Sequence, residues 1–221
     1  EMTAGLLPAL AMPRVTDSGF IPAEQRVVMP EAEALKVYGR SIQQEEIAKG
    51  LGEGPRLLRG IAGTGKTLIM LYRAKLTAAN DPSQRILVLC WNTALANYMR
   101  QAYEKFQFEA KGKVEIVHFT QFARDLLHWY RDPEYGWDSS KVMEELNRVS
   151  IPDRNKYDAV YIDEAQDFRK EWIEFIFNRL IKGEPGERNL IVAADDAQRI
   201  YKDRAFTWSF IGVTMVGRSK I

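Results

Sequence analysis

The chain has 221 residues, of which 46% are hydrophobic and 28% are charged, and its formal net charge is +1 at neutral pH. This composition excludes a disordered chain. Because the net charge is near zero, any binding to nucleic acid must come from a local patch and not from the overall charge. No apolar run approaches the roughly 18 residues of a membrane span. The single cysteine, Cys90, excludes an internal disulfide. We therefore expect a cytoplasmic protein without membrane association, in which Cys90 is a buried thiol.

The first part of the chain has no regular hydrophobic pattern. Residues 1–40 hold four of the nine prolines, so we predict an extended lead-in or the end of a preceding domain. Because the sequence starts at Glu1 without a methionine, we also expect it to be a piece of a longer protein. The string SIQQEEIAKGL, residues 41–51, has apolar residues at helical spacing, and Gly52 and Gly54 are expected to end that helix.

Five short runs that are almost continuously apolar follow, and segments with helical spacing lie between them. Such runs predict strands that are buried on both faces of a sheet. Alternation of strands and helices predicts parallel pairing through right-handed crossovers. The predicted fold class is therefore α/β, a doubly wound parallel sheet with helices on both faces, in a domain spanning residues 41–221. The predicted strands are residues 56–58, 86–90, 114–117, 159–162 and 190–194.

Two segments between the strands carry further predictions. Residues 168–183 repeat apolar side chains every three or four positions, which predicts a helix that ends at Gly183. Residues 132–156 interrupt the alternation and predict a short insertion with one helix near residues 141–147. The aromatic side chains around the insertion fit either a small satellite core or a surface that stacks on bases. They are Trp129, Tyr130, Tyr135 and Trp137.

The string GIAGTGKT, residues 60–67, fits the phosphate-loop pattern G-x-x-x-x-G-K-[ST] at every fixed position. Its glycines permit the torsions and close approaches that aim backbone N–H groups at phosphate oxygens. We expect Lys66 to reach the β and γ phosphates and Thr67 to ligate Mg²⁺. The competing interpretation is a glycine-rich turn beside an ordinary surface lysine. The residues predicted to bind the triphosphate are Gly60, Ala62, Gly63, Thr64, Gly65, Lys66 and Thr67.

Two acidic residues, Asp163 and Glu164, follow the predicted strand at residues 159–162 in the string YDAVYIDEAQDF. Carboxylates at the end of a buried strand are costly unless a metal or a proton transfer uses them. We expect Asp163 to hold Mg²⁺ through water and Glu164 to act as the general base on the attacking water. Alone, the pair also fits a helix N-cap with a first-turn charge, but together with a phosphate loop the catalytic interpretation is favoured.

A third string, LIVAADDAQRIY, places Gln198 shortly after the last predicted inner strand. A glutamine at that place can sense the γ-phosphate without titrating, which suits a relay between nucleotide state and movement. We therefore count Gln198 with Lys66 and Glu164 as a candidate catalytic residue.

The strings GIAGTGKT, DEAQDF and ADDAQRIY resemble motifs I, II and III of the UvrD/Rep-like superfamily 1 DNA helicases, and the DEAQD box is more specific than a general ATPase signature. Two departures from the family pattern are Ala194, where a glycine is usual, and Thr120, where many members have histidine. Gln44 resembles the glutamine that reads adenine in this family, with the adjacent Gln43 as the alternative match.

The resemblance also implies contacts with single-stranded DNA. The string ILVLCWNTALANYM resembles motif Ia, in which Trp91 or Asn92 would meet the strand. The string VHFTQFARDLL resembles the next DNA-contacting motif, with Phe119 at its aromatic position, and Tyr201 is a further stacking candidate. Aromatic rings can grip any sequence because every base has a π face.

The resemblance covers the first RecA-like, ATP-binding domain of a P-loop NTPase and implies ATP and Mg²⁺ as cofactors. It further implies a helicase or translocase motor, as in DNA repair enzymes, with a second RecA-like domain that is absent from this chain. Arg218, close to the end of the sequence, is a poor candidate for the arginine finger that such a second domain provides. A nucleotide-binding switch or scaffold with little turnover is the alternative function.

Overall fold

The computed structural model describes residues 42–106, 110–128, 139–195 and 216–220. The chain separates into two compact units, Glu1–Gln43 and Gln44–Ile221. In the first unit only residues 42 and 43 are described, and they are helical. The candidate site is built by the second unit.

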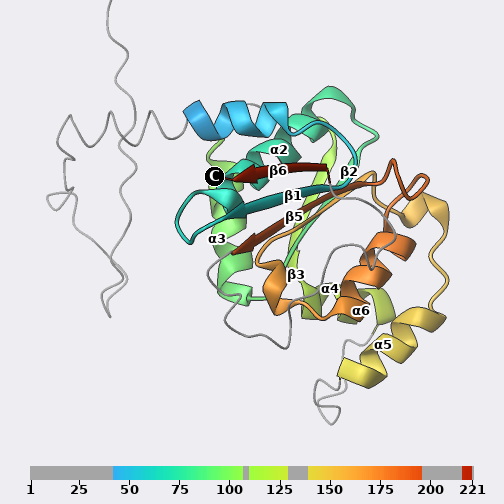
Figure 1. Cartoon of the computed structure of the whole chain (residues 1–221). Helices are drawn as coiled ribbons and strands as arrows, with labels where there is room; N and C mark the ends of the chain where they lie inside the picture. Colours follow the sequence, from blue (N-terminus) through green and yellow to red (C-terminus); the bar gives the residue numbers. More distant parts are fainter. Residues whose placement is uncertain (1–41, 107–109, 129–138, 196–215, 221) are drawn as a thin grey trace, which may run out of the picture. The chain divides into compact units, whose positions relative to one another are not determined.

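A six-stranded sheet in the order β3-β2-β4-β5-β1-β6 forms the centre of the second unit, and every pairing in it is parallel (Figure 1). All five predicted strands are present, with bounds that differ from the predicted ones by at most two residues. A sixth strand, β6, pairs with β1 at the edge of the sheet and was not predicted, because its sequence VGRSK has no apolar run. The strands are β1 (Arg56–Gly60), β2 (Arg85–Cys90), β3 (Lys113–His118), β4 (Ala159–Ile162), β5 (Asn189–Asp195) and β6 (Val216–Lys220).

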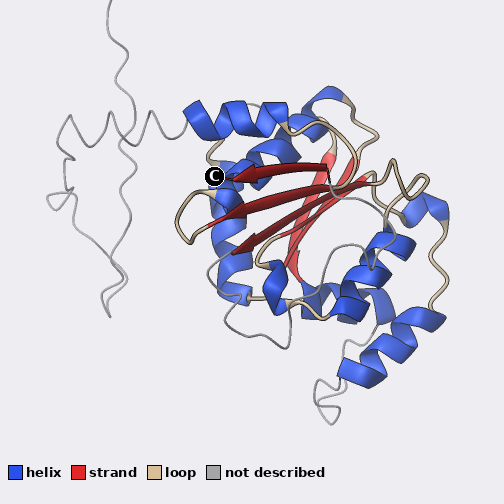
Figure 2. Ribbon diagram, viewed as in Figure 1, coloured by secondary structure: helices blue, strands red, loops and turns tan. Residues whose placement is uncertain are grey.

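Alternate residues of the inner strands pack into two separate hydrophobic cores, one on each face of the sheet. Leu57 and Val160 belong to the first core, whereas their neighbours Leu58 and Tyr161 belong to the second. Helices cover both faces (Figure 2), so the predicted doubly wound α/β class is confirmed. The first core packs against α4 (Phe119–Leu127), α5 (Ser139–Arg148) and α6 (Lys170–Phe175), and the second against α2 (Lys66–Asn80), α3 (Thr93–Glu104) and the helix at residues 42–50.

Cys90 is fully buried in the second core, and burial raises its thiol pKa to about 12, so the predicted buried thiol is confirmed. Among the described residues, no helix is both long enough and apolar enough to cross a bilayer.

Of two helix ends predicted from glycines, the structure confirms one and corrects the other. The helix at residues 42–50 ends as predicted, with Gly52 and Gly54 at φ values of 68° and 87°, in the left-handed region that glycine tolerates. The helix that begins with α6 continues as a π-helix, η4 (Ile176–Leu180). It ends before Gly183, because Ile181 is extended and forms a parallel bridge with Tyr157. The prediction that Gly183 ends this helix was therefore wrong by about three residues.

The segment predicted as an insertion contains α5, which is slightly longer than the predicted helix at residues 141–147. Its four aromatic residues at positions 129, 130, 135 and 137 lie outside the described residues. Their assignment to a satellite core or to a base-stacking surface stays a prediction.

Candidate nucleotide-binding site

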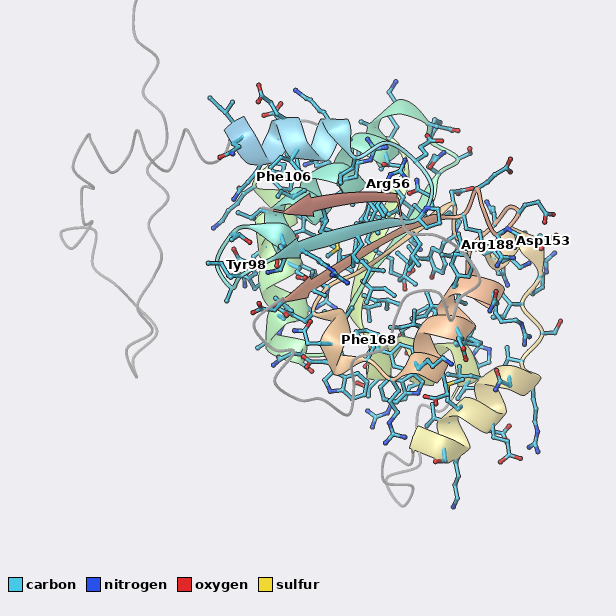
Figure 3. The ribbon with its side chains drawn as sticks, in the orientation of Figure 1. Arg56, Tyr98, Phe106, Asp153, Phe168 and Arg188 are labelled. Atoms are coloured by element: carbon cyan, nitrogen blue, oxygen red, sulfur yellow. The ribbon has the colours of Figure 1, made fainter. Side chains whose placement is uncertain are left out.

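Three motifs that are far apart in the sequence meet at the carboxyl edge of the sheet. Gly60 ends β1 and is in register with Asp195, the last residue of β5. Asp163 directly follows β4, which is the other neighbour of β5. Figure 3 shows Tyr98 on the side where β1 and β5 end, and Arg188 and Asp153 on the side where they begin. Open parallel α/β sheets bind their ligands at the carboxyl edge, so this is the edge to search for a site.

The loop between β1 and α2 curls around the ammonium group of Lys66. The Lys66 Nζ donates to the carbonyl oxygens of Gly60 at 2.8 Å and Ile61 at 3.0 Å, and the side chain is only 6% exposed. Gly63 and Gly65 have φ values of 79° and 87°, which side chains with a Cβ rarely adopt. The loop therefore has the curled shape and the central cation that a phosphate group requires.

Gln44 lies against the same loop. Its Nε2 approaches the Thr64 carbonyl oxygen at 3.5 Å, and a Cβ built on Gly65 would lie only 1.8 Å from that nitrogen. Gly65 is therefore required twice, once for its torsion and once for the space that Gln44 fills. This contact places Gln44 beside the predicted phosphate site, while its role in reading adenine stays a prediction.

The Thr67 hydroxyl joins the phosphate loop to the acidic pair. It donates to the Asp163 carboxylate, with 2.6 Å between Thr67 Oγ1 and Asp163 Oδ2, although the two residues are 96 positions apart. Asp163 is fully buried, and this burial raises its pKa to about 6, with a further increase from the nearby Glu164 charge and an opposing effect of the Thr67 hydrogen bond. A buried carboxylate with a raised pKa would be ionised more readily beside a cation.

The donors at this point fit Mg²⁺ in a nucleotide complex. Within the described ranges, no group of three or more His, Cys, Asp or Glu side chains is arranged to hold a metal ion. Mg²⁺ is usually held by one or two protein oxygens, with water and substrate phosphates completing its coordination. The hydroxyl of Thr67 and the carboxylate of Asp163 supply this kind of partial donor set.

Glu164 has an unusual backbone conformation. Its φ and ψ are both 49°, in the left-handed region, and the only other described non-glycine residue with positive φ is His128. Its N–H donates to Asp163 Oδ1 at 3.0 Å, which ties the two acidic residues together. Non-glycine residues in this region cost about 1–3 kcal/mol and concentrate at functional sites. The half-buried Glu164 thus has both the exposure and the fixed backbone that a general base needs.

The predicted DNA-contacting aromatics lie in a cluster of four rings, which we call the aromatic cluster: Trp91, Phe119, Phe168 and Trp172. Trp91 stacks on Trp172 with 4.7 Å between ring centroids and 12° between ring planes. Phe119 is 0% exposed, so a base could stack on it only after the aromatic cluster opens. The DNA contacts of Trp91 and Phe119 stay predictions.

The other DNA candidates differ in how far the structure describes them. Asn92 is exposed and caps α3, since its Oδ1 accepts the N–H of Ala94 at 2.7 Å and that of Leu95 at 3.3 Å. Gln198 and Tyr201 lie outside the described residues.

Comparison with known proteins adds to this geometry. The family described as AAA domain matches residues 43–204, which is most of the chain and includes the phosphate loop and the acidic pair. The chain belongs to the AAA domain family. Comparison with curated proteins gives no significant match. Among solved structures, the chain is similar to a Sulfolobus solfataricus SWI2/SNF2 ATPase core in complex with dsDNA, at 18% identity and a TM-score of 0.40.

That similarity covers 80% of this chain and 34% of the Sulfolobus protein, so this chain spans about a third of that protein's length. Family and fold together support the coarser expectation from the sequence, a P-loop domain with a doubly wound α/β fold.

One residue of the site in this AAA domain was not singled out from the sequence. The Gln166 side chain contacts both the Glu164 carboxylate and the backbone N–H of Asp195. The signal available was the position of Gln166 inside the DEAQD string, but spacing alone does not reveal which strand a side chain turns toward.

Proposed function

We propose that this chain is the motor domain of an ATP-dependent DNA helicase or translocase of the UvrD/Rep-like superfamily 1. The observation that carries the proposal is the 2.6 Å hydrogen bond between Thr67 and Asp163. It brings the end of the phosphate loop and the end of β4 together, although β5 lies between β1 and β4 in the sheet. A Mg²⁺–triphosphate site needs these two parts side by side.

In the proposed site, the loop and the start of α2 bind the phosphates. The backbone N–H groups of residues 60–67 and the positive end of α2 favour negative charge, and Lys66 adds a full charge at the centre of the loop. Bound Mg²⁺ would neutralise charge that builds up on the phosphate oxygens, with Thr67 and Asp163 holding it. Gln44 is placed by this proposal beside the adenine.

Hydrolysis then requires a base for water. The water oxygen forms a bond to the γ-phosphorus, the bond from that phosphorus to the β–γ bridging oxygen breaks, and Glu164 accepts the proton of the water. The products are ADP and inorganic phosphate. Positioning and charge stabilisation supply most of the rate enhancement in phosphoryl transfer, and both are functions of the groups described here.

Coupling to single-stranded DNA is the part of the proposal that rests on the sequence resemblance. It assigns Gln198 to the link with the γ-phosphate and Trp91, Asn92, Phe119 and Tyr201 to the strand. It also implies a second RecA-like domain as a partner. From the single cysteine we further propose a cytoplasmic location.

ATP hydrolysis by the full-length protein, with and without single-stranded DNA, tests this function. We expect DNA to stimulate turnover several-fold, and Glu164→Gln to lower both the basal and the stimulated rate about 10²-fold to 10⁴-fold. Tight ATP binding without any stimulation by DNA would contradict the motor and support the alternative, a nucleotide-binding switch or scaffold.

A further inference from the structure

The side chain of Gln166 connects two parts of the candidate site that come from different strands. Its Nε2 donates a hydrogen bond to the Glu164 carboxylate, and its Oε1 accepts the backbone N–H of Asp195 at 3.4 Å. Glu164 follows β4 and Asp195 ends β5, and these two strands are neighbours in the sheet. The amide therefore spans the gap between the predicted general base and the next strand.

The chemistry of the two partners fixes the orientation of this amide. A carboxylate can only accept hydrogen bonds, and a backbone N–H can only donate one. The Gln166 amide offers a donor and an acceptor on separate atoms of one planar group, and only one of its two orientations satisfies both partners. Neither a glutamate nor a methionine at position 166 could make both contacts.

The backbone that carries Gln166 is also well fixed. It belongs to a one-turn 3₁₀ helix, η3 (Ala165–Asp167), closed by hydrogen bonds from Asp167 N to Glu164 O at 2.9 Å and from Phe168 N to Ala165 O at 3.1 Å. Phe168, directly after this turn, is buried in the aromatic cluster. The turn therefore holds the Gln166 side chain at a constant place relative to β4.

The two hydrogen bonds of Gln166 differ in strength. The bond to Glu164 has an ionised acceptor, which makes such bonds roughly twice as strong as neutral ones. The bond from Asp195 N is neutral, and 3.4 Å is long for an N–H···O contact. Gln166 thus holds Glu164 firmly and reaches β5 with a contact that is easily made or lost.

We propose that Gln166 is a positioning residue that orients the Glu164 carboxylate and makes this orientation depend on the position of the end of β5. The proposal rests on the proposed ATP hydrolysis, in which Glu164 is the base. Gln166 itself touches neither phosphate nor water in this scheme. Its effect is to select one rotamer of the Glu164 side chain, because the left-handed backbone alone does not fix that rotamer.

The kinetic test uses two variants of nearly constant volume. Gln166→Met keeps the size of the side chain and removes both hydrogen bonds, and Gln166→Glu keeps the acceptor toward Asp195 but sets a negative charge against Glu164. Because a misplaced base loses rate and not ground-state binding, kcat should fall about 10-fold to 100-fold in both, with the Kd for ATP within about twofold of wild type. The matched control is Gln101→Met, on the exposed face of α3, with unchanged kcat.

A purely structural role would give different results. Gln166→Met with wild-type kcat, or with a kcat loss matched by an equal loss of ATP affinity, would overturn the proposal. Adding Gln166→Met to a Glu164→Gln protein should cause no further loss, because the residue acts through Glu164, and a further 10-fold loss would also count against it. If Glu164→Gln itself hydrolyses ATP at the wild-type rate, the proposed function fails.

The contact itself can be tested without turnover. The side-chain amide resonances of Gln166 in a ¹⁵N–¹H correlation spectrum are identified by their loss in Gln166→Met. They should shift in Glu164→Ala, which removes the acceptor, and stay in place in Gln101→Met. Unchanged Gln166 resonances in Glu164→Ala would show that the hydrogen bond is absent in solution and would overturn the proposal, whatever the result for hydrolysis.

Discussion

Asp158 and Asp163 flank the two ends of the same short strand, β4, and their surroundings are opposite in character. Asp158, before the strand, pairs with Lys182 at 2.8 Å and accepts the N–H of Arg85 at 2.8 Å. Asp163, after the strand, is bound by the neutral Thr67 hydroxyl and the Glu164 N–H. The chain thus supplies a full positive charge as the bonded partner of the first carboxylate and only neutral donors for the second.

This difference separates the edge of the sheet that stabilises the fold from the edge that we propose binds the nucleotide. At the amino edge, Tyr157 also donates to Glu115 at 3.0 Å and lies under the Arg85 guanidinium. Those polar groups satisfy one another. At the carboxyl edge, a buried carboxylate with a raised pKa and a strained glutamate persist together. Costs of this kind are typical of a site that completes its interactions with a substrate.

The largest effect on ATP affinity should come from removing the central cation of the carboxyl edge. Lys66→Ala leaves the carbonyls of Gly60 and Ile61 without their donor and the phosphates without their counter-charge, so ATP affinity and turnover should fall about 100-fold or more. Calorimetric titration with Mg·ATP measures the affinity. If Lys66→Ala binds ATP like wild type, the carboxyl edge is not the nucleotide site.

Glu164→Gln should separate binding from chemistry. The glutamine keeps the size of the side chain but cannot accept the proton, so hydrolysis should fall about 10²-fold to 10⁴-fold while ATP stays bound. Steady-state phosphate release and equilibrium ATP binding give the two quantities. An equal loss of binding in Glu164→Gln and Lys66→Ala would contradict the different roles assigned to them.

The two aspartates should respond to amidation with opposite signs. Burial raises the pKa of Asp163 in the folded protein to about 6, from an ordinary value of 3.8. Its protonated form therefore stabilises the fold below about pH 4, and this contribution is lost as the pH rises through about 6. Asparagine is always neutral. The free energy of unfolding of Asp163→Asn should therefore exceed that of wild type by about 1–3 kcal/mol at pH 8, and the difference should vanish near pH 4.

Urea titrations in the presence of a chelator measure these free energies at each pH. Asp158→Asn is the matched control, and it should be less stable than wild type by about 1 kcal/mol at pH 8, because it removes the partner of Lys182. A stabilised Asp158→Asn, or an Asp163→Asn whose effect does not change with pH, would remove the contrast between the two edges.

The smallest effect is expected for Lys182→Ala at the amino edge. The ion pair with Asp158 is partly exposed, so its loss should lower the free energy of unfolding by about 1 kcal/mol or less. ATP affinity and turnover should be unchanged, since this edge lies at the far end of β4 from Asp163. Thermal unfolding and the same ATP titration check both statements, and a changed ATP affinity would be unexpected.

The sequence was informative where one local pattern decides the structure. Apolar runs located the five predicted strands, and GIAGTGKT located the loop, because the glycines at 63 and 65 permit the positive φ values that the loop requires. Parallel topology then predicts that Lys66 and Asp163 meet at one edge of the sheet. The 2.6 Å contact of Thr67 with Asp163 agrees with that prediction.

Features that depend on partners from elsewhere in the fold were missed. The β6 sequence VGRSK is polar and forms a strand because β1 offers an unpaired edge. The end of the helix at Leu180 depends on the bridge between Ile181 and Tyr157. Gln166 joins two strands through its side chain, and side-chain direction follows from backbone torsions that the sequence does not state.

The stacked indoles of Trp91 and Trp172 have an experimental use. Two rings with centroids 4.7 Å apart and planes 12° apart are close enough for their electronic transitions to couple. A difference spectrum in far-ultraviolet circular dichroism, wild type minus Trp172→Phe, isolates this couplet from the other tryptophans. Loss of the couplet on adding nucleotide or DNA would report opening between the end of β2 and α6 without any attached dye.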